Sequence, residues 1–289
     1  MRVFRKKRRG FRYNTKENHD NQVVPLYKLF PNIITILVLC IGITAIRYAL
    51  DGKFNIAAGL IVIASFMDGL DGRIARLLKS TSEFGAYLDS FADIASFGIA
   101  PGIVTYLWAL HNIPYKGIGW GVILIYISCA ALRLARFNVQ NIGSGSLSQN
   151  KNKKQGYDET QDQELINTVK GSPGSFYLGS FFSGIPMPAA AVLCITPLML
   201  TFDMLSGYTL PTLFIAMYVL VVGFLMVSRI PTFAAKHMKI KRIYVPLLLF
   251  GSAIFVVSML LEPWIVMPLV AFGYIISLPF CFFYVRKNG

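Results

Sequence analysis

Eight apolar stretches separated by short polar segments make up most of the chain after residue 28. Most are long enough to cross the apolar layer of a bilayer as a helix. They predict an all-α integral membrane protein with about eight transmembrane helices in a single domain, residues 29–289. The predicted helices cover residues 30–50, 56–78, 84–109, 117–136, 186–202, 211–228, 245–261 and 264–284.

Composition and charge support this class. The chain is 55% hydrophobic and 15% charged, and its mean hydropathy is +0.55. With eight spans, 25 of the 28 Lys and Arg residues fall on one side of the membrane, and only Arg47, Lys53 and Lys116 fall on the other. The positive-inside rule then predicts that both termini are cytoplasmic. We expect a multi-pass protein of the cell (inner) membrane. The net charge of +14 indicates contact with anionic lipid and not with nucleic acid.

Two polar segments stand apart from the apolar stretches. Residues 1–28 are rich in Lys and Arg and predict a basic cytoplasmic arm. Residues 141–175 are polar and nearly free of large apolar side chains, so they cannot form a core of their own. They predict a flexible cytoplasmic loop.

Four aspartates interrupt the apolar pattern between residues 68 and 93. Asp68 and Asp71 are three residues apart in one predicted helix, and Asp89 and Asp93 are four apart in the next. Each spacing places both carboxylates on one helical face, and the short connection lets the two faces meet. Four carboxylates in one pocket need cations. Hard divalent ions such as Mg²⁺ or Mn²⁺ fit oxygen ligands, and zinc does not suit a cluster without His or Cys.

The residues around these acids point to a phosphate-bearing ligand. Gly72, Ala75 and Gly85 leave room for a ligand near the helix backbone, and Arg76 follows Asp71 on the same helix. Arginine beside a carboxylate and metal site suits phosphate, so the group indicates phosphoryl transfer. A single aspartate at a helix end is often only interfacial. Four acids in two helix-spaced pairs favour function instead.

The complete pattern is D-x2-D-G-x2-A-R-x8-G-x3-D-x3-D, and the chain matches it from Asp68 to Asp93 at every fixed position. It resembles the motif of the CDP-alcohol phosphotransferase family. The resemblance implies that family's helical bundle, with a single transmembrane catalytic domain, a homodimer, and an active site facing the cytoplasm.

The resemblance also implies roles for individual residues. Two divalent cations, Mg²⁺ or Mn²⁺, would be held by Asp68, Asp71, Asp89 and Asp93, and Asp93 would also be the catalytic base. The residues that would bind CDP-diacylglycerol are Asn32, Thr35, Gly72, Ala75, Arg76 and Gly85. Of these, Asn32 and Thr35 belong to a P-N-x-x-T element that equally fits a helix begun by Pro31 and capped by a polar residue.

Other segments bear on the acceptor alcohol. The runs SFGIAP (96–101), RLARFN (133–138), FSGIPMPAAA (182–191) and SRIPTFAAK (228–236) resemble the membrane-integral phosphatidylserine synthases. That resemblance implies transfer of a phosphatidyl group to L-serine, with release of CMP. Arg133 and Arg136 are the candidates to bind serine. Both also fit ordinary basic anchors at the membrane surface.

Three alternatives stay open. The acceptor can instead be glycerol 3-phosphate or inositol phosphate, for which the basic segment 229–242 offers charge. An intramembrane prenyltransferase also uses paired aspartates, but the D-G-x2-A-R filling disfavours it. A divalent-cation transporter is the non-enzymatic alternative, and it would need polar groups across the whole bilayer.

Overall fold

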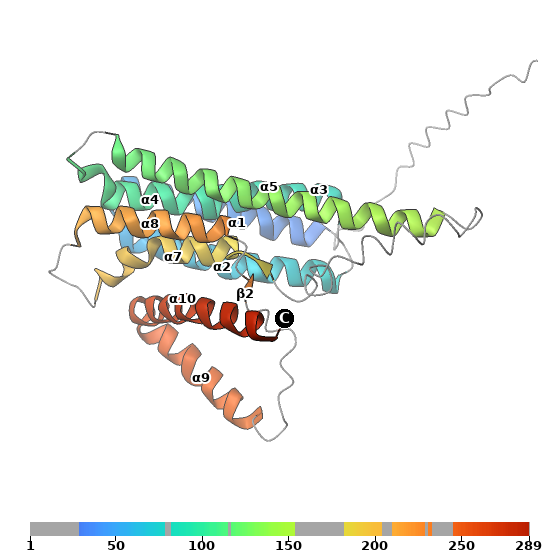
Figure 1. Ribbon diagram of the computed structural model, residues 1–289. Helices are drawn as coiled ribbons and strands as arrows, with labels where there is room; N and C mark the ends of the chain where they lie inside the picture. The colour runs from blue at the N-terminus through green and yellow to red at the C-terminus, as the bar shows by residue number, and fades with distance from the viewer. Residues whose placement is uncertain are drawn as a thin grey trace, which may run out of the picture.

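The computed structural model is almost entirely helical over the part of the chain that it describes (Figure 1). The described residues are 29–78, 82–114, 117–153, 182–203, 210–228, 231–232 and 245–288. The predicted arm 1–28 and residues 154–175 of the predicted loop lie outside them. The helices are α1 (Phe30–Leu50), α2 (Phe54–Leu77), α3 (Glu83–Asp93), η2 (Ile94–Ile99), α4 (Ala100–Trp108), η3 (Leu110–Asn112), α5 (Ile118–Lys153), α7 (Met187–Leu200), α8 (Thr212–Val227), α9 (Val245–Leu261) and α10 (Pro263–Asn288).

Helices occupy all eight predicted stretches, with two differences. The stretch 84–109 consists of α3, a π-helical turn η2, and α4. Helix α5 does not end near residue 136 but continues to Lys153, so residues 141–153 are helical and not the start of an irregular loop. No proline interrupts this segment, and extending an existing helix needs no new nucleation.

One small β-ladder joins two connecting segments. Strand β1 (Phe182–Ser183) pairs antiparallel with β2 (Pro231–Thr232), and Phe182 lies opposite Thr232. The ladder therefore ties the segment before α7 to the segment after α8.

Small side chains allow the first two helices to pack closely. Helices α1 and α2 lie against each other over much of their length, and the interface includes the buried Ala45, Ala49, Ala57 and Ala58. Helices α5 and α8 form a second close pair, and α7 contacts α2, α4 and α10. In Figure 1, α9 diverges from α10 at the edge of the molecule. The centre of the bundle is thus formed by α4, α5, α7 and η2.

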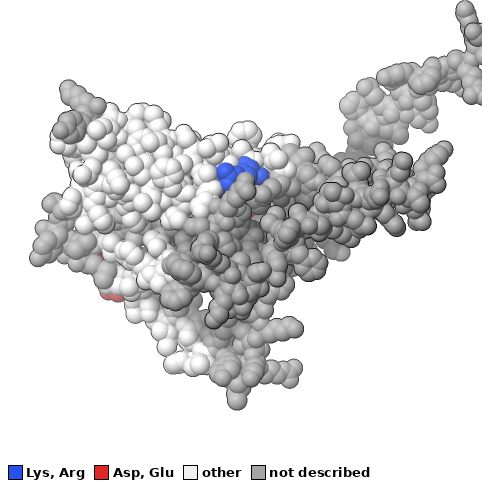
Figure 2. All heavy atoms as spheres, viewed as in Figure 1, with Lys and Arg blue, Asp and Glu red and all other residues white. Residues whose placement is uncertain are grey.

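The outer surface of the bundle is apolar. Large side chains such as Leu213, Phe224, Phe250 and Leu260 are more than half exposed. Figure 2 shows that the described surface in view is nearly free of charge apart from one basic group over α5 and a small acidic patch at the lower left. Among the described residues, four helices are long and apolar enough to cross a membrane, within Phe30–Leu50, Phe54–Ile74, Phe84–Trp108 and Ile118–Val139. Four shorter apolar helices accompany them. An apolar surface of this extent is suited to lipid and not to water.

Candidate active site

The four aspartates of the motif meet between α2 and α3. Carboxylate oxygens of Asp68, Asp71 and Asp89 all lie within 4.8 Å of one another. Asp93 follows Asp89 by one helical turn, and its carboxyl group is hydrogen-bonded to that of Asp68. The prediction that the two pairs face each other is therefore confirmed.

The local sequence explains why α3 begins where it does, so that Asp89 and Asp93 reach the aspartates of α2. Ser82 precedes the helix in an extended conformation, and its hydroxyl accepts a hydrogen bond of 3.0 Å from the backbone N–H of Gly85. Serine is a favoured N-cap because it satisfies an N–H that the helix leaves open. Asp89 and Asp93 then lie two to three turns into α3, on the face toward α2.

The first turns of α1 contribute directly to the cluster. The hydroxyl of Thr35 donates to Oδ2 of Asp71 at 3.2 Å, and Asp71 is only 5% exposed. Pro31 lies in the first turn of α1, and Leu29 is the N-cap residue, so Asn32 has no capping role. Of the two interpretations of the P-N-x-x-T element, the structure supports a place at the site.

Two glycines of the motif serve different purposes. A Cβ atom at Gly85 would lie 2.8 Å from Oδ1 of Asn32, so a larger residue at position 85 would displace the Asn32 side chain from α3. A Cβ at Gly72 would have no neighbouring atom within 4 Å, so open space lies beside Asp71. Ala75 and Arg76 belong to α2, but their side chains lie outside the described part of the structure.

The donor set of this cluster fits a divalent metal ion. Three carboxylates from two helices offer oxygen atoms in one small volume, with the half-buried carboxyl group of Asp93 alongside. Oxygen donors of this kind bind Mg²⁺, Mn²⁺ or Ca²⁺. Asp68, Asp71 and Asp89 can therefore hold a divalent cation, and the cation would offset the repulsion between them.

Arg133 and Arg136, the two candidates for binding serine, make different contacts in the structure. Arg133 lies within electrostatic range of Asp93 and Tyr274, and its Nε atom is buried without a hydrogen-bond partner among the described residues. Arg136 instead donates from Nη1 to the carbonyl of Val227 at 2.8 Å, at the end of α8. Arg133 thus faces the acids, and Arg136 joins α5 to α8.

A polar pair that the motif did not reveal joins α3 to α5. Ser90, next to Asp89, donates to Oδ1 of Asn138 at 3.2 Å, and the Asn138 amide lies 3.1 Å from the Ser90 hydroxyl. Asn138 ends the run RLARFN, but the sequence could not tell which helix it would contact. The pair helps to fix the position of α5 along its axis relative to the aspartates.

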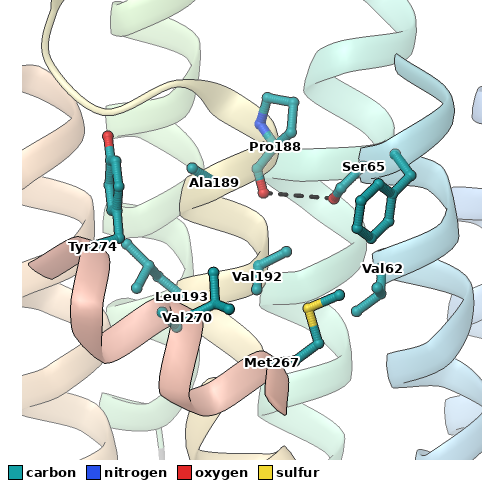
Figure 3. A pocket seen from close by; sticks show the side chains of 11 residues that line it. Val62, Ser65, Pro188, Ala189, Val192, Leu193, Met267, Val270 and Tyr274 are labelled. Atoms are coloured by element: carbon teal, nitrogen blue, oxygen red, sulfur yellow. Dashed lines mark hydrogen bonds between the residues drawn. The ribbon is translucent and has the colours of Figure 1, made fainter. Parts of the chain in front are cut away.

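An apolar cavity of about 230 Å³ lies between α2, α7 and α10 (Figure 3). Val62, Val192, Met267 and Val270 form much of its wall. Its polar members connect it with the site. Ser65, which donates to the carbonyl of Pro188 at 3.5 Å, lies one turn before Asp68 on α2, and Tyr274 is within electrostatic range of Arg133. The lining of the cavity therefore comes within one helical turn of Asp68 on α2.

Comparisons with known proteins agree with this geometry. The family model described as CDP-alcohol phosphatidyltransferase matches residues 28–157. A CDP-diacylglycerol–serine O-phosphatidyltransferase of Mycobacterium leprae is 33% identical over 253 residues, covering 88% of this chain and 74% of the relative. The enzyme of the same name from Helicobacter pylori strain J99 is 36% identical over 236 residues, covering 80% and 83%. An archaetidylserine synthase of Methanothermobacter thermautotrophicus is 34% identical over 123 residues, covering 42% and 51%. With these relatives, and with the four aspartates gathered as the motif requires, the chain belongs to the CDP-alcohol phosphatidyltransferase family.

Proposed function

We propose that this protein transfers the phosphatidyl group of CDP-diacylglycerol to the hydroxyl of L-serine, giving phosphatidylserine and CMP. The observation that carries the proposal is the meeting of Asp68, Asp71 and Asp89 within 4.8 Å, with Asp93 hydrogen-bonded to Asp68. The names of the relatives from M. leprae and H. pylori support serine as the acceptor.

In the proposed reaction, the serine oxygen attacks the phosphorus that carries diacylglycerol. A new P–O bond to serine forms, the P–O bond to CMP breaks, and the serine proton passes to the carboxylate of Asp93. Asp68, Asp71 and Asp89, with a share from Asp93, would hold Mg²⁺ or Mn²⁺. Two such ions would neutralise the diphosphate and make CMP a better leaving group.

The surrounding residues would bind the two substrates. The open space beside Gly72 gives the nucleotide access to the helix backbone, with Asn32, Thr35, Ala75, Arg76 and Gly85 around it. Arg133 is the better of the two candidates for the serine carboxylate, because it lies near Asp93 and its buried Nε has no partner among the described residues. Arg136 would act by holding α5 against α8.

The apolar cavity of Figure 3 suits part of an acyl chain of the lipid substrate. Its position one turn from Asp68 matches a lipid whose phosphate lies at the carboxylates and whose chains extend toward the middle of the membrane. Apolar walls bind such a chain without needing polar partners.

Membrane topology belongs to the same proposal. Eight spans with both termini cytoplasmic would place the carboxylates at the cytoplasmic edge of the inner membrane, where soluble serine and CMP exchange with water. The homodimer stays a prediction. Transport of cations is less well supported, because a pathway needs buried polar groups along the bilayer. Outside the cluster, the acidic side chains that the structure describes are Asp51, Asp203 and Glu262, and all three are exposed.

The reaction is tested by CMP release from CDP-diacylglycerol with a panel of acceptors. We expect release with L-serine and Mn²⁺ or Mg²⁺, and a fall of roughly 100-fold or more in Asp93→Asn, since loss of a catalytic base typically has that effect. Release with glycerol 3-phosphate or inositol phosphate and not with serine would contradict the acceptor assignment. Release with no alcohol would contradict the enzyme.

Metal binding is tested without turnover. We expect Mn²⁺ to raise the Tm of the detergent-solubilised protein, because a ligand of the folded state stabilises it, and chelation to reverse the rise. Asp71→Asn should lose most of this shift. The exposed Asp51→Asn serves as the matched control and should keep it. An equal shift in wild type and Asp71→Asn would exclude this cluster as the metal site.

The two arginines should differ in kinetics. We expect Arg133→Ala to raise the KM for serine about 10-fold or more while the KM for CDP-diacylglycerol changes little, since a hydrogen bond to a charged group contributes roughly 1.5–3 kcal/mol. Arg136→Ala should lower the Tm and affect the serine KM less. The assignment fails if Arg133→Ala changes both KM values equally.

Filling the cavity should act on long-chain lipid only. We expect Ala189→Trp, a cavity-lining change, to raise the KM for dioleoyl CDP-diacylglycerol about fivefold or more, by analogy with the cost of overpacking. A dihexanoyl analogue should be much less affected. Val221→Trp places an added ring on the exposed face of α8 and should change neither value. Equal effects on both lipids would show that the cavity does not take an acyl chain.

A further inference from the structure

A π-helical turn follows the proposed base directly. Asp93 ends α3, and η2 (Ile94–Ile99) begins at the next residue. The backbone N–H of Ala100 bonds to the carbonyl of Ala95, five residues back. One inserted residue turns the downstream helix by about 100° relative to a continuous α-helix. This offset lets Asp89 and Asp93 face α2 while Phe97 and Ala100 pack inside the bundle.

Proline leaves one carbonyl of this turn without its usual donor. In the register set by Ala100 and Ala95, residue 101 would donate to the carbonyl of Ser96, but Pro101 has no N–H. Tyr126 of α5 holds the neighbouring carbonyl of the turn. Its hydroxyl donates to the Phe97 carbonyl at 3.1 Å and lies 3.4 Å from the carbonyl of Ala190. Tyr126 and Phe97 are both fully buried, so water does not compete for this bond.

The same face of α5 reaches the acids. Tyr126, Ala130 and Arg133 follow one another at helical spacings of four and three residues, so they share a face. Ala130 packs where a Cβ atom at Gly98 would lie 3.3 Å from its own Cβ, and Arg133 lies within electrostatic range of Asp93. One face of α5 thus lies along η2 and extends to the proposed base.

The opposite side of the turn is held by α1. Ser96 donates to the carbonyl of Val38 at 3.1 Å, and a Cβ atom at Gly42 would lie 2.5 Å from Oγ of Ser96. The π-turn is therefore fixed on one side by close backbone contact and on the other by the Tyr126 hydroxyl.

We propose that Tyr126 is a positioning residue for the reaction: its hydroxyl holds the π-turn at the Phe97 carbonyl and thereby sets Asp93 against Arg133. The Tyr126 hydroxyl bonds to backbone carbonyls, of Phe97 and Ala190, and not to the carboxylates. Loss of the hydroxyl would let the turn relax toward another register and move Asp93 away from the acceptor. The kinetic consequence rests on the proposed function above, whereas the structural consequence does not.

The kinetic test compares Tyr126→Phe with a matched tyrosine variant. We expect Tyr126→Phe to lower kcat about tenfold, with the KM values for serine and CDP-diacylglycerol changed less than twofold. Tyr106→Phe, which removes the hydroxyl of a tyrosine whose ring packs on Trp120, should keep the wild-type kcat. A Tyr126 hydroxyl without a positioning role would leave kcat unchanged or change the KM values as much as kcat, and either result would overturn the proposal.

Hydrogen exchange tests the structural part without turnover. We expect the backbone amides of Gly98, Ile99, Ala100 and Gly102 to exchange at least tenfold faster in Tyr126→Phe, and at the wild-type rate in Tyr106→Phe. Unchanged exchange in Tyr126→Phe would overturn the positioning role. A wild-type protein that releases no CMP would overturn the proposed function while leaving this measurement decisive for Tyr126.

Discussion

Four carboxyl groups share a small volume inside an apolar helical bundle, and their mutual repulsion is the constraint on which the site depends. Two like charges 4 Å apart repel by about 4 kcal/mol at the effective dielectric constant near a protein surface. Among the described basic residues, Arg133 lies within electrostatic range of Asp93. A divalent cation, or a proton shared between two carboxyl groups, would offset the remaining repulsion. The same repulsion explains why the acids need external support from Thr35 and the short connection between α2 and α3.

Bringing the four carboxyl groups together also requires particular backbone geometry, at Gly85 and at the π-turn. Gly85 leaves space for the Asn32 side chain of α1, and Thr35, one turn further along α1, donates to Asp71. If α3 continued as a regular helix through residue 99, the face carrying Asp89 and Asp93 would not match the face that packs against α5. The helix therefore departs from regular α geometry next to Asp93, and the π-turn is held by the Ser96 hydroxyl on Val38 of α1 and by the Tyr126 hydroxyl on the Phe97 carbonyl. The irregular turn sets the direction in which Asp89 and Asp93 point, and this direction matters more for the site than a regular helix does.

Much of this could be predicted from sequence because the information is local. Apolar stretches define the helices, and spacings of three and four residues define the faces of Asp68, Asp71, Asp89 and Asp93. The π-turn could not be predicted, because it depends on partners from α1 and α5 that lie 29 to 58 residues away. The different roles of Arg133 and Arg136 also depend on distant groups, since one residue faces Asp93 and the other reaches the end of α8. The continuation of α5 to Lys153 was missed because polar composition resembles that of a loop whether or not a helix extends into it.

The two substrates are served by different parts of the chain, and this division has a physical basis. The groups proposed for the donor lie in one continuous region, residues 31–93, where short connections hold the metal ligands and the nucleotide site at fixed distances. The groups proposed for the acceptor come from α5 and border α10, as Arg133 and Tyr274 do. The helix α10 contacts the rest of the bundle mainly through α7, whereas the aspartates lie on α2 and α3. Changes in α5 and α10 can therefore alter the acceptor while the phosphoryl-transfer centre stays intact, so the aspartate motif alone identifies the donor chemistry and not the alcohol.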